Sequence, residues 1–127
     1  MKSDADIMLP VDYKICDEEA MKVRSKNGQI VEITKKMPLE VAEGEFIGIC
    51  SFKKEVIPAL KEKTKQLLKE KAFMEYFESA IQRLIDEEDF TIQAFPTGEA
   101  FWAEIDFIED YEKAAASIPE SLVNLRV

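Results

Sequence analysis

The first part of the chain is organised around the stretch Met21-Lys22-Val23-Arg24-Ser25-Lys26-Asn27-Gly28-Gln29-Ile30-Val31-Glu32-Ile33. Its Asn-Gly pair separates two short runs that carry alternating or β-branched apolar residues. Asn and Gly tolerate the positive φ angles of a two-residue hairpin turn, which makes this pair the strongest short-range hairpin signal. The sequence therefore predicts a β-hairpin with strands at residues 21–24 and 30–33.

Apolar runs on either side of the hairpin predict two more strands, at residues 7–13 and 46–52. The second run is apolar nearly throughout, which is typical of a strand covered on both faces. A loop at residues 35–44 precedes it. Residues 54–71 and 73–85 then repeat apolar side chains at helical spacing, and this predicts two amphipathic helices.

The last third of the chain predicts a second hairpin and a final helix. Strands are expected at residues 90–95 and 100–107, joined by the turn Pro96-Thr97-Gly98-Glu99. The helix is expected from Ile108 to about Ser117. This order of elements predicts a single α/β domain over residues 1–127, with a mixed sheet, two β-hairpins and about three helices.

Composition excludes several classes of function. The 127 residues carry a formal net charge of −9, which disfavours nucleic acid and anionic membrane as partners. Histidine is absent, so catalytic triads with histidine and histidine-ligated metals are excluded. Cys16 and Cys50 form no CxxC pair and are expected to be reduced, partly buried thiols. The amino terminus has no apolar signal region, and no apolar run approaches the roughly 20 residues of a membrane span, so we expect a cytoplasmic protein.

The segment Phe101-Trp102-Ala103-Glu104-Ile105-Asp106 carries the strongest chemical signal. On a strand, Trp102, Glu104 and Asp106 share one face. Two neighbouring carboxylates repel each other unless a cation lies nearby, and hard oxygen ligands suit Mg²⁺. The alternative is an edge strand with two ordinary solvent-exposed charges.

Three further residues are candidates on weaker grounds. Lys35, at the end of the hairpin, has the charge to hold a phosphate, or it is half of a solvated pair with Lys36. Gly48 lies inside an apolar run, where a glycine marks either a close approach of a ligand or simple packing. Glu45 lies just before that run. Trp102 offers a ring face for a quaternary ammonium, or it packs in the core.

Taken together, these segments resemble the sugar-nucleotidyltransferase-like family, and within it the branch of phosphocholine and related cytidylyltransferases. The resemblance covers the chain from Ala5 to about Ala116. It rests on Val11-Asp12, Met21-Lys22-Val23, Asn27-Gly28-Gln29-Ile30-Val31-Glu32-Ile33-Thr34-Lys35, Gly44-Glu45-Phe46-Ile47-Gly48-Ile49, Trp102-Ala103-Glu104-Ile105-Asp106 and Glu109-Asp110-Tyr111.

The resemblance implies a Rossmann-like three-layer fold and transfer of a nucleotidyl group, expected to be cytidylyl, from a nucleoside triphosphate to a phosphorylated small molecule. It implies that Asp106 binds Mg²⁺ and that Lys35 contacts phosphates, both as catalytic residues. Glu104 would orient water on the metal. Glu45 and Gly48 would bind the acceptor, which is phosphocholine, a phosphonate or a sugar phosphate.

The chain also departs from the family. It has four glycines and no Gly-rich phosphate loop, and the Gly-Asp pair that supplies a first metal ligand is missing. The resemblance is therefore to the C-terminal half only, and we expect this half to be inactive alone. Missing neighbouring strands would expose a sheet edge, so we expect association through that edge. Two alternatives stay open, a non-catalytic binding or regulatory module that keeps the scaffold, and a purely structural domain.

Overall fold

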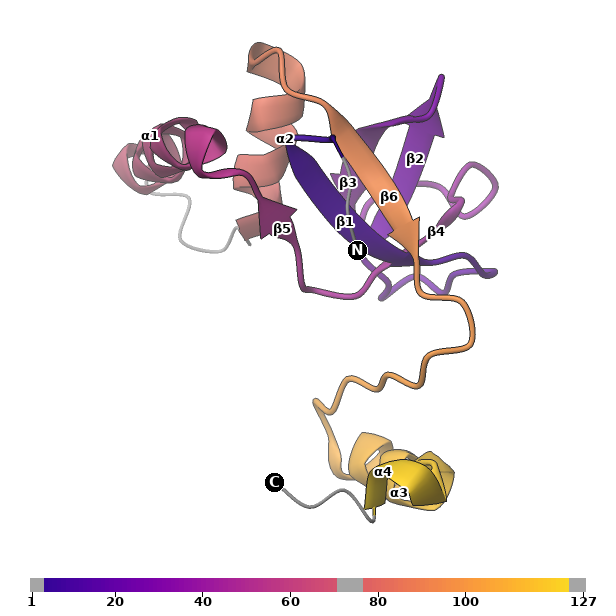
Figure 1. The fold of residues 1–127 in the computed structure, drawn as a ribbon. Coiled ribbons are helices and arrows are strands. Elements are labelled where there is room, and N and C mark those ends of the chain that lie inside the picture. Colours follow the sequence, from indigo (N-terminus) through magenta and orange to yellow (C-terminus); the bar gives the residue numbers. More distant parts are fainter. Residues whose placement is uncertain (1–3, 71–76, 124–127) are drawn as a thin grey trace.

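The chain forms one mixed β-sheet with helices packed on it, in a computed structural model that describes residues 4–70 and 77–123 (Figure 1). In these residues there are six strands and four α-helices. The strands are β1 (Ile7–Asp12), β2 (Lys22–Lys26), β3 (Gln29–Thr34), β4 (Gly44–Phe46), β5 (Ser51–Phe52) and β6 (Ile92–Pro96). The helices are α1 (Ile57–Lys69), which follows the 3-10 turn η1 (Lys54–Val56), α2 (Phe77–Glu87), α3 (Ile108–Ser117) and α4 (Glu120–Val123). The expected α/β class and mixed sheet are confirmed.

Strand β1 is the centre of the sheet. One of its edges pairs in parallel with β6, and the other pairs antiparallel with β5 near its start and β4 near its end. Strand β2 joins β4 to β3, which is the outermost strand on that side. Ile7, Leu9 and Val11 of β1 have no exposed surface and form the core with side chains of β2, β3 and α2. Burial of these apolar side chains is the main favourable term for the fold.

The hairpin predicted around Asn27 and Gly28 is confirmed as β2 and β3. Both residues have positive φ angles, 52° and 78°, as a primed two-residue turn requires. Lys26 pairs directly with Gln29 across it. The turn sets the register of the residues next to it, and an irregularity between Arg24 and Ser25 then shifts the register of the rest of the hairpin.

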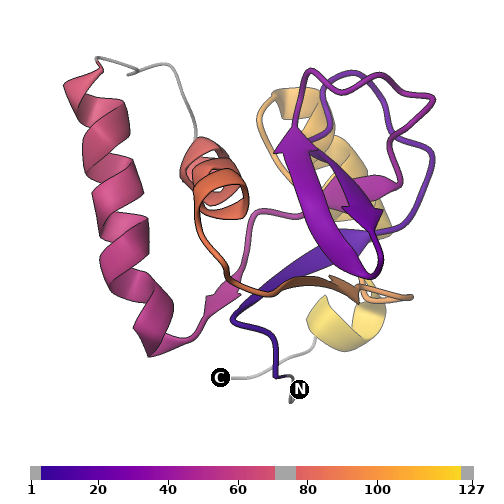
Figure 2. The same ribbon diagram turned by 90° about the horizontal axis from the view of Figure 1, so that it is seen from above.

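Helices α1 and α2 cover one side of the sheet. Helix α2 lies between α1 and the hairpin, packs on β3, and contacts α1 on its other side (Figure 2). The buried Lys63 of α1 forms ion pairs with Glu87 (3.1 Å) and Glu88 (3.4 Å) at the end of α2. The helix predicted over residues 54–71 is η1 followed by α1, which ends at Lys69. The helix predicted over residues 73–85 is α2, which continues to Glu87. Residues 71–76 of these predictions lie outside the described residues.

The prediction of one continuous strand over residues 46–52 is wrong. It is divided into the end of β4 and the two-residue β5, which pair with different halves of β1. Gly48 lies between them with φ of 92°, a conformation that breaks a strand. Gly44 is needed for another reason, because a Cβ there would lie 2.7 Å from both Asp12 O and Val11 Cγ1.

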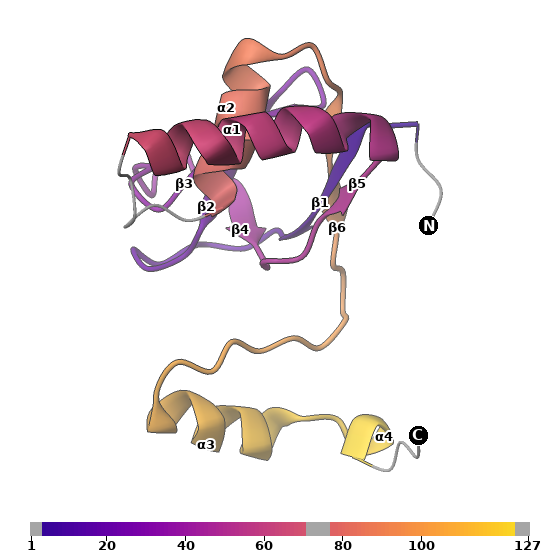
Figure 3. The same cartoon turned by 90° about the vertical axis from the view of Figure 1, so that its left-hand side faces the viewer.

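The expected second hairpin is also wrong. Strand β6 pairs with β1 in parallel, and residues 100–107 form no strand. After β6 the chain turns at Gly98, which has φ of 61°, and runs away from the sheet as an extended segment that leads into α3 (Figures 1 and 3). We call residues 99–123 the C-terminal arm. Helix α3 has the predicted bounds.

No helix in the described part of the chain combines the length and the apolar character needed to cross a membrane.

The sheet edge at β3 is capped by a side chain. The Gln82 amide of α2 accepts a hydrogen bond from the Ile33 N–H (2.8 Å) and donates one to the Val31 carbonyl (3.2 Å), as a neighbouring strand would. At the other edge, β6 has no second strand among the described residues. There Gln29 Oε1 accepts from the Ile92 N–H (2.8 Å), and Pro96 has no N–H. Both devices hinder edge pairing.

Replacing Gln82 by Ala should destabilise the chain by about 1–3 kcal/mol, because the buried Ile33 N–H loses its acceptor. Urea unfolding followed by far-ultraviolet circular dichroism measures this. Glu62→Ala on the exposed surface of α1 is the control and should leave the midpoint nearly unchanged. Equal midpoints for both variants would show that the amide does not stabilise the sheet edge.

Candidate functional site

Five of the six residues singled out in the sequence line one cavity of about 670 Å³: Lys35, Glu45, Gly48, Glu104 and Asp106. Its walls come from the loop before β2, the end of β3, strand β4, the start of α2 and the C-terminal arm. We call it the acidic cavity. Trp102 lies in an adjoining cavity of about 370 Å³, the tryptophan cavity, and Glu45, Glu104 and Asp110 line both.

Carboxylates dominate the acidic cavity. One lysine, Lys35, lines it together with seven acidic residues: Asp17, Glu19, Glu45, Glu78, Glu104, Asp106 and Asp110. Asp17 and Asp110 accept backbone N–H groups and Glu45 pairs with Lys14, which leaves Glu78 and Glu104 as neighbouring like charges that a bound cation would separate. The cavity is therefore suited to a ligand with positive charge, and to an anionic group only near Lys35.

Glu78 is the acidic residue of this cavity whose burial matters most. Its Oε2 is enclosed and makes no hydrogen bond within the described part of the chain. Burial raises the pKa of Glu78, the charge of Glu104 raises it further, and Lys35 acts in the opposite direction. Burial and the same Glu78 carboxylate raise the pKa of Cys50 to about 11, so that thiol is not a nucleophile at neutral pH.

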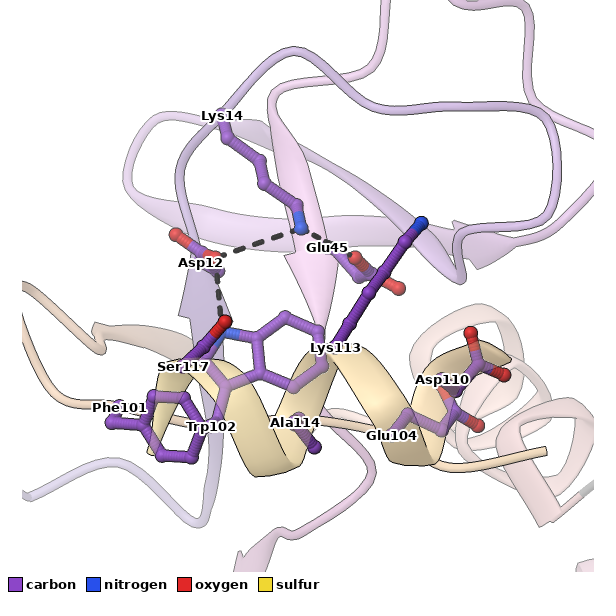
Figure 4. Close-up of a pocket in the computed structure, with 11 residues that line it drawn as sticks. Asp12, Lys14, Glu45, Phe101, Trp102, Glu104, Asp110, Lys113, Ala114 and Ser117 are labelled. Carbon is purple, nitrogen blue, oxygen red and sulfur yellow. Dashed lines mark hydrogen bonds and ion pairs between the residues drawn. The ribbon is translucent and has the colours of Figure 1, made fainter. Parts of the chain in front are cut away.

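Trp102 anchors the C-terminal arm to the sheet. Its indole Nε1–H donates a hydrogen bond to Asp12 Oδ2 at the end of β1 (2.9 Å), as Figure 4 shows. Lys14 Nζ lies 4.9 Å from the centre of the indole ring, 3.0 Å from Glu45 Oε1 and 3.7 Å from Asp12 Oδ2. The four side chains form one network, which we call the Trp102 anchor.

The expected shared face of Trp102, Glu104 and Asp106 is absent because these residues form no strand. Trp102 and Glu104 still line the tryptophan cavity together, while Asp106 lines the acidic cavity only. Lys14 was missed in the sequence, where it was one lysine in an ordinary loop. Burial lowers the pKa of Lys14, but the hydrogen bond and charge of Glu45 outweigh this and raise it overall.

Lys22 fixes one wall of the acidic cavity, and it too was missed in the sequence. The residue is 1% exposed, and its Nζ donates to the carbonyls of Glu18 (2.9 Å), Ala20 (3.2 Å) and Lys35 (2.6 Å). The ammonium group thereby ties the loop before β2 to the end of β3. It sets the position of the Lys35 backbone relative to that loop.

Asp106, the expected metal ligand, lines the acidic cavity. Asp110 has another task, because its Oδ2 accepts from the N–H groups of Asp106 (3.1 Å) and Phe107 (3.0 Å) and so caps α3. Among the described residues no three acidic or thiol side chains come close enough together to enclose a metal ion. These residues fit a Mg²⁺ ion that has one protein carboxylate as a ligand and takes its other ligands from water and substrate phosphates.

Replacing Asp12 by Ala should weaken the docking of the arm by about 1–2 kcal/mol, because the Trp102 N–H loses a charged acceptor. Trp102 is the single tryptophan, so its emission should shift to the red and acrylamide should quench it more strongly. Asp89→Ala, an exposed aspartate after α2, is the matched control. An unchanged spectrum in Asp12→Ala would contradict the anchor.

Replacing Glu78 by Gln should stabilise the chain at neutral pH. The pKa of this carboxyl is higher in the folded than in the unfolded chain, so its charge costs stability as pH rises from the ordinary value of 4.5 through the folded pKa. The advantage of Glu78→Gln in urea unfolding should therefore be larger at about pH 7 than at about pH 4. Glu62→Gln serves as the exposed control; an advantage of Glu78→Gln independent of pH would contradict the proposed cost.

Comparison with models of protein families and with curated protein sequences finds no match to this chain. The resemblance therefore rests on the motifs of the sequence alone.

Proposed function

We propose that this chain is the acceptor-side portion of a Mg²⁺-dependent nucleotidyltransferase. It would transfer a nucleotidyl group, with cytidylyl favoured by the resemblance, to a phosphorylated small molecule. One observation supports this above the others: the residues that the motifs assign to phosphate, metal and acceptor come from separate parts of the sequence and line one cavity.

In the proposed reaction a phosphate or phosphonate oxygen of the acceptor attacks the α-phosphorus of the nucleoside triphosphate. A new P–O bond forms as the bond to the β-phosphate breaks, and pyrophosphate leaves. Bound Mg²⁺ would neutralise charge on the phosphates, and Asp106 would be its protein ligand. Lys35 would hold a phosphate as a point charge.

The charge of the cavity favours one kind of acceptor. A phosphate group alone would be repelled by the seven carboxylates. An acceptor with an ammonium group at its other end would place that group near Glu78 and Glu104, since Glu45 already pairs with Lys14, with its phosphate toward Lys35. This supports phosphocholine or an aminoalkylphosphonate over a sugar phosphate.

A second candidate is a binding or regulatory module without catalysis. The observation in its favour is that no three acidic side chains meet closely in the described residues, so ligand binding would not need a metal ion. For the first candidate we expect nucleotidyl transfer only together with a segment that supplies the triphosphate-binding loop.

Fluorescence of Trp102 tests both candidates, since its network includes Glu45 of the acidic cavity. The chain is titrated with Mn²⁺, CTP and phosphocholine, as wild type, as Asp106→Asn and as the control Asp89→Asn. A saturable, metal-dependent change that only Asp106→Asn loses is the expected result.

The other outcomes are equally distinct. A change with phosphocholine that needs no metal and survives Asp106→Asn would support the binding module. No change with any of the three ligands would contradict both candidates.

A further inference from the structure

Charge is strongly segregated between two parts of the chain. The C-terminal arm carries one lysine against seven acidic residues: Glu99, Glu104, Asp106, Glu109, Asp110, Glu112 and Glu120. Residues 53–69, which contain α1, carry six lysines and two glutamates. A chain with net charge −9 thus has one basic surface and one especially acidic surface.

The arm is also amphipathic. Phe101, Trp102, Ala103 and Glu104 of the extended segment line the tryptophan cavity. Phe101 and Ala103 also line, together with Ile105, a groove of about 310 Å³ that Trp102 and Glu104 do not reach. Some residues line both, and the groove is completed by apolar side chains of α3 and the residue after it: Tyr111, Ala114, Ala115 and Ile118. Tyr111 is 62% exposed, and neither α3 nor α4 has a buried residue. The groove is an open apolar surface, and the segment that forms it also carries Glu104, Asp110 and Glu112 in its sequence.

Helix α1 presents a complementary face. Lys61, Lys65, Leu68 and Lys69 recur at helical spacing and are all exposed. Leu68, 57% exposed, is a large apolar side chain among the lysines. The opposite face of α1, with Lys63 and Leu67, is buried. We call the exposed set the basic face.

The two surfaces cannot meet within one chain. Figure 3 shows α1 beside the strands, while α3 lies well beyond the ends of β1 and β6. A second copy of the chain, however, brings a basic face to the acidic arm of the first. Two arms facing each other would instead oppose like charges, which disfavours a symmetric contact.

We propose that copies of this chain associate head to tail, with the basic face of α1 in one copy docked on the arm groove of the next. Leu68 enters the apolar groove, and Lys61, Lys65 and Lys69 lie against acidic residues of the arm such as Glu112. This is recognition of an amphipathic helix by a groove. Because the two surfaces differ, the contact is heterologous and leads to rings or longer assemblies. The proposal does not depend on the proposed function.

Two variants, each with one damaged surface, test this directly. The helix variant carries Lys61→Glu, Lys65→Glu and Lys69→Glu, and the arm variant carries Tyr111→Lys and Ile118→Lys. Each keeps the surface that the other lacks. Lys26→Glu with Lys36→Glu, two exposed lysines outside the basic face, is the control. Circular dichroism establishes that each variant is folded, and sedimentation velocity measures association.

The wild type and the control should form species larger than a monomer across a dilution series. Association should weaken between about 0.1 M and about 1 M salt, as the screening length falls from about 10 Å to about 3 Å. Each variant alone should associate at least roughly tenfold more weakly than the wild type. The helix variant reverses exposed ion pairs, and the arm variant places charges in the apolar groove. An equal mixture of the two should form a 1:1 dimer and nothing larger, because one intact contact remains.

A monomeric wild type would overturn the proposal. So would a helix variant that associates like the wild type, which would show that α1 takes no part. Loss of association in the arm variant alone, with no dimer in the mixture, would indicate a symmetric arm-to-arm contact and would also overturn it.

Discussion

The hydrogen bond from the Trp102 indole to Asp12 holds the C-terminal arm against the end of β1. Lys14 strengthens this contact, since its ammonium group pairs with Asp12 and Glu45 and lies over the indole ring. Everything proposed for the candidate site depends on the anchor, because the arm supplies Glu104, Asp106 and Asp110 to the acidic cavity. Helix α3 has no buried residue, so apolar packing does not hold the arm in place. The polar contacts of the Trp102 anchor determine the position of the arm.

Elements with local signals were predictable from the sequence. Asn27-Gly28 set the hairpin, and the helix expected from Ile108 to about Ser117 is α3. The errors arose where the outcome depends on partners distant in sequence. Residues 100–107 were expected to pair with residues 90–95, but β6 pairs with β1 instead, and no neighbour remains for the extended segment. Its composition is that of a strand, but a strand needs a partner for its backbone groups.

The site was predictable in part for the same reason. Lys35, Glu45, Gly48, Glu104 and Asp106 were selected by type and order, and the fold brings them to one cavity. Lys14 and Lys22 were not selected, because lysines near strands are usually solvated and nothing local marks a buried one. Their roles depend on carbonyls and carboxylates that only the tertiary structure gathers.

The C-terminal arm lines both the candidate site and the apolar groove, so binding at either place depends on the position of the arm. Trp102 and Glu104 face the candidate site, while Phe101, Ala103 and Ile105, which alternate with them, contribute to the apolar groove. A partner that binds the groove only while the arm is docked would stabilise the docked arm. The docked arm is also what completes the acidic cavity. A cation bound between Glu78 and Glu104 would favour the docked arm as well, because Glu104 belongs to the arm and its charge adds to the effect of burial on the pKa of Glu78. Linkage is reciprocal, so a ligand in the cavity and a partner on the groove would strengthen each other's binding by the same factor without touching.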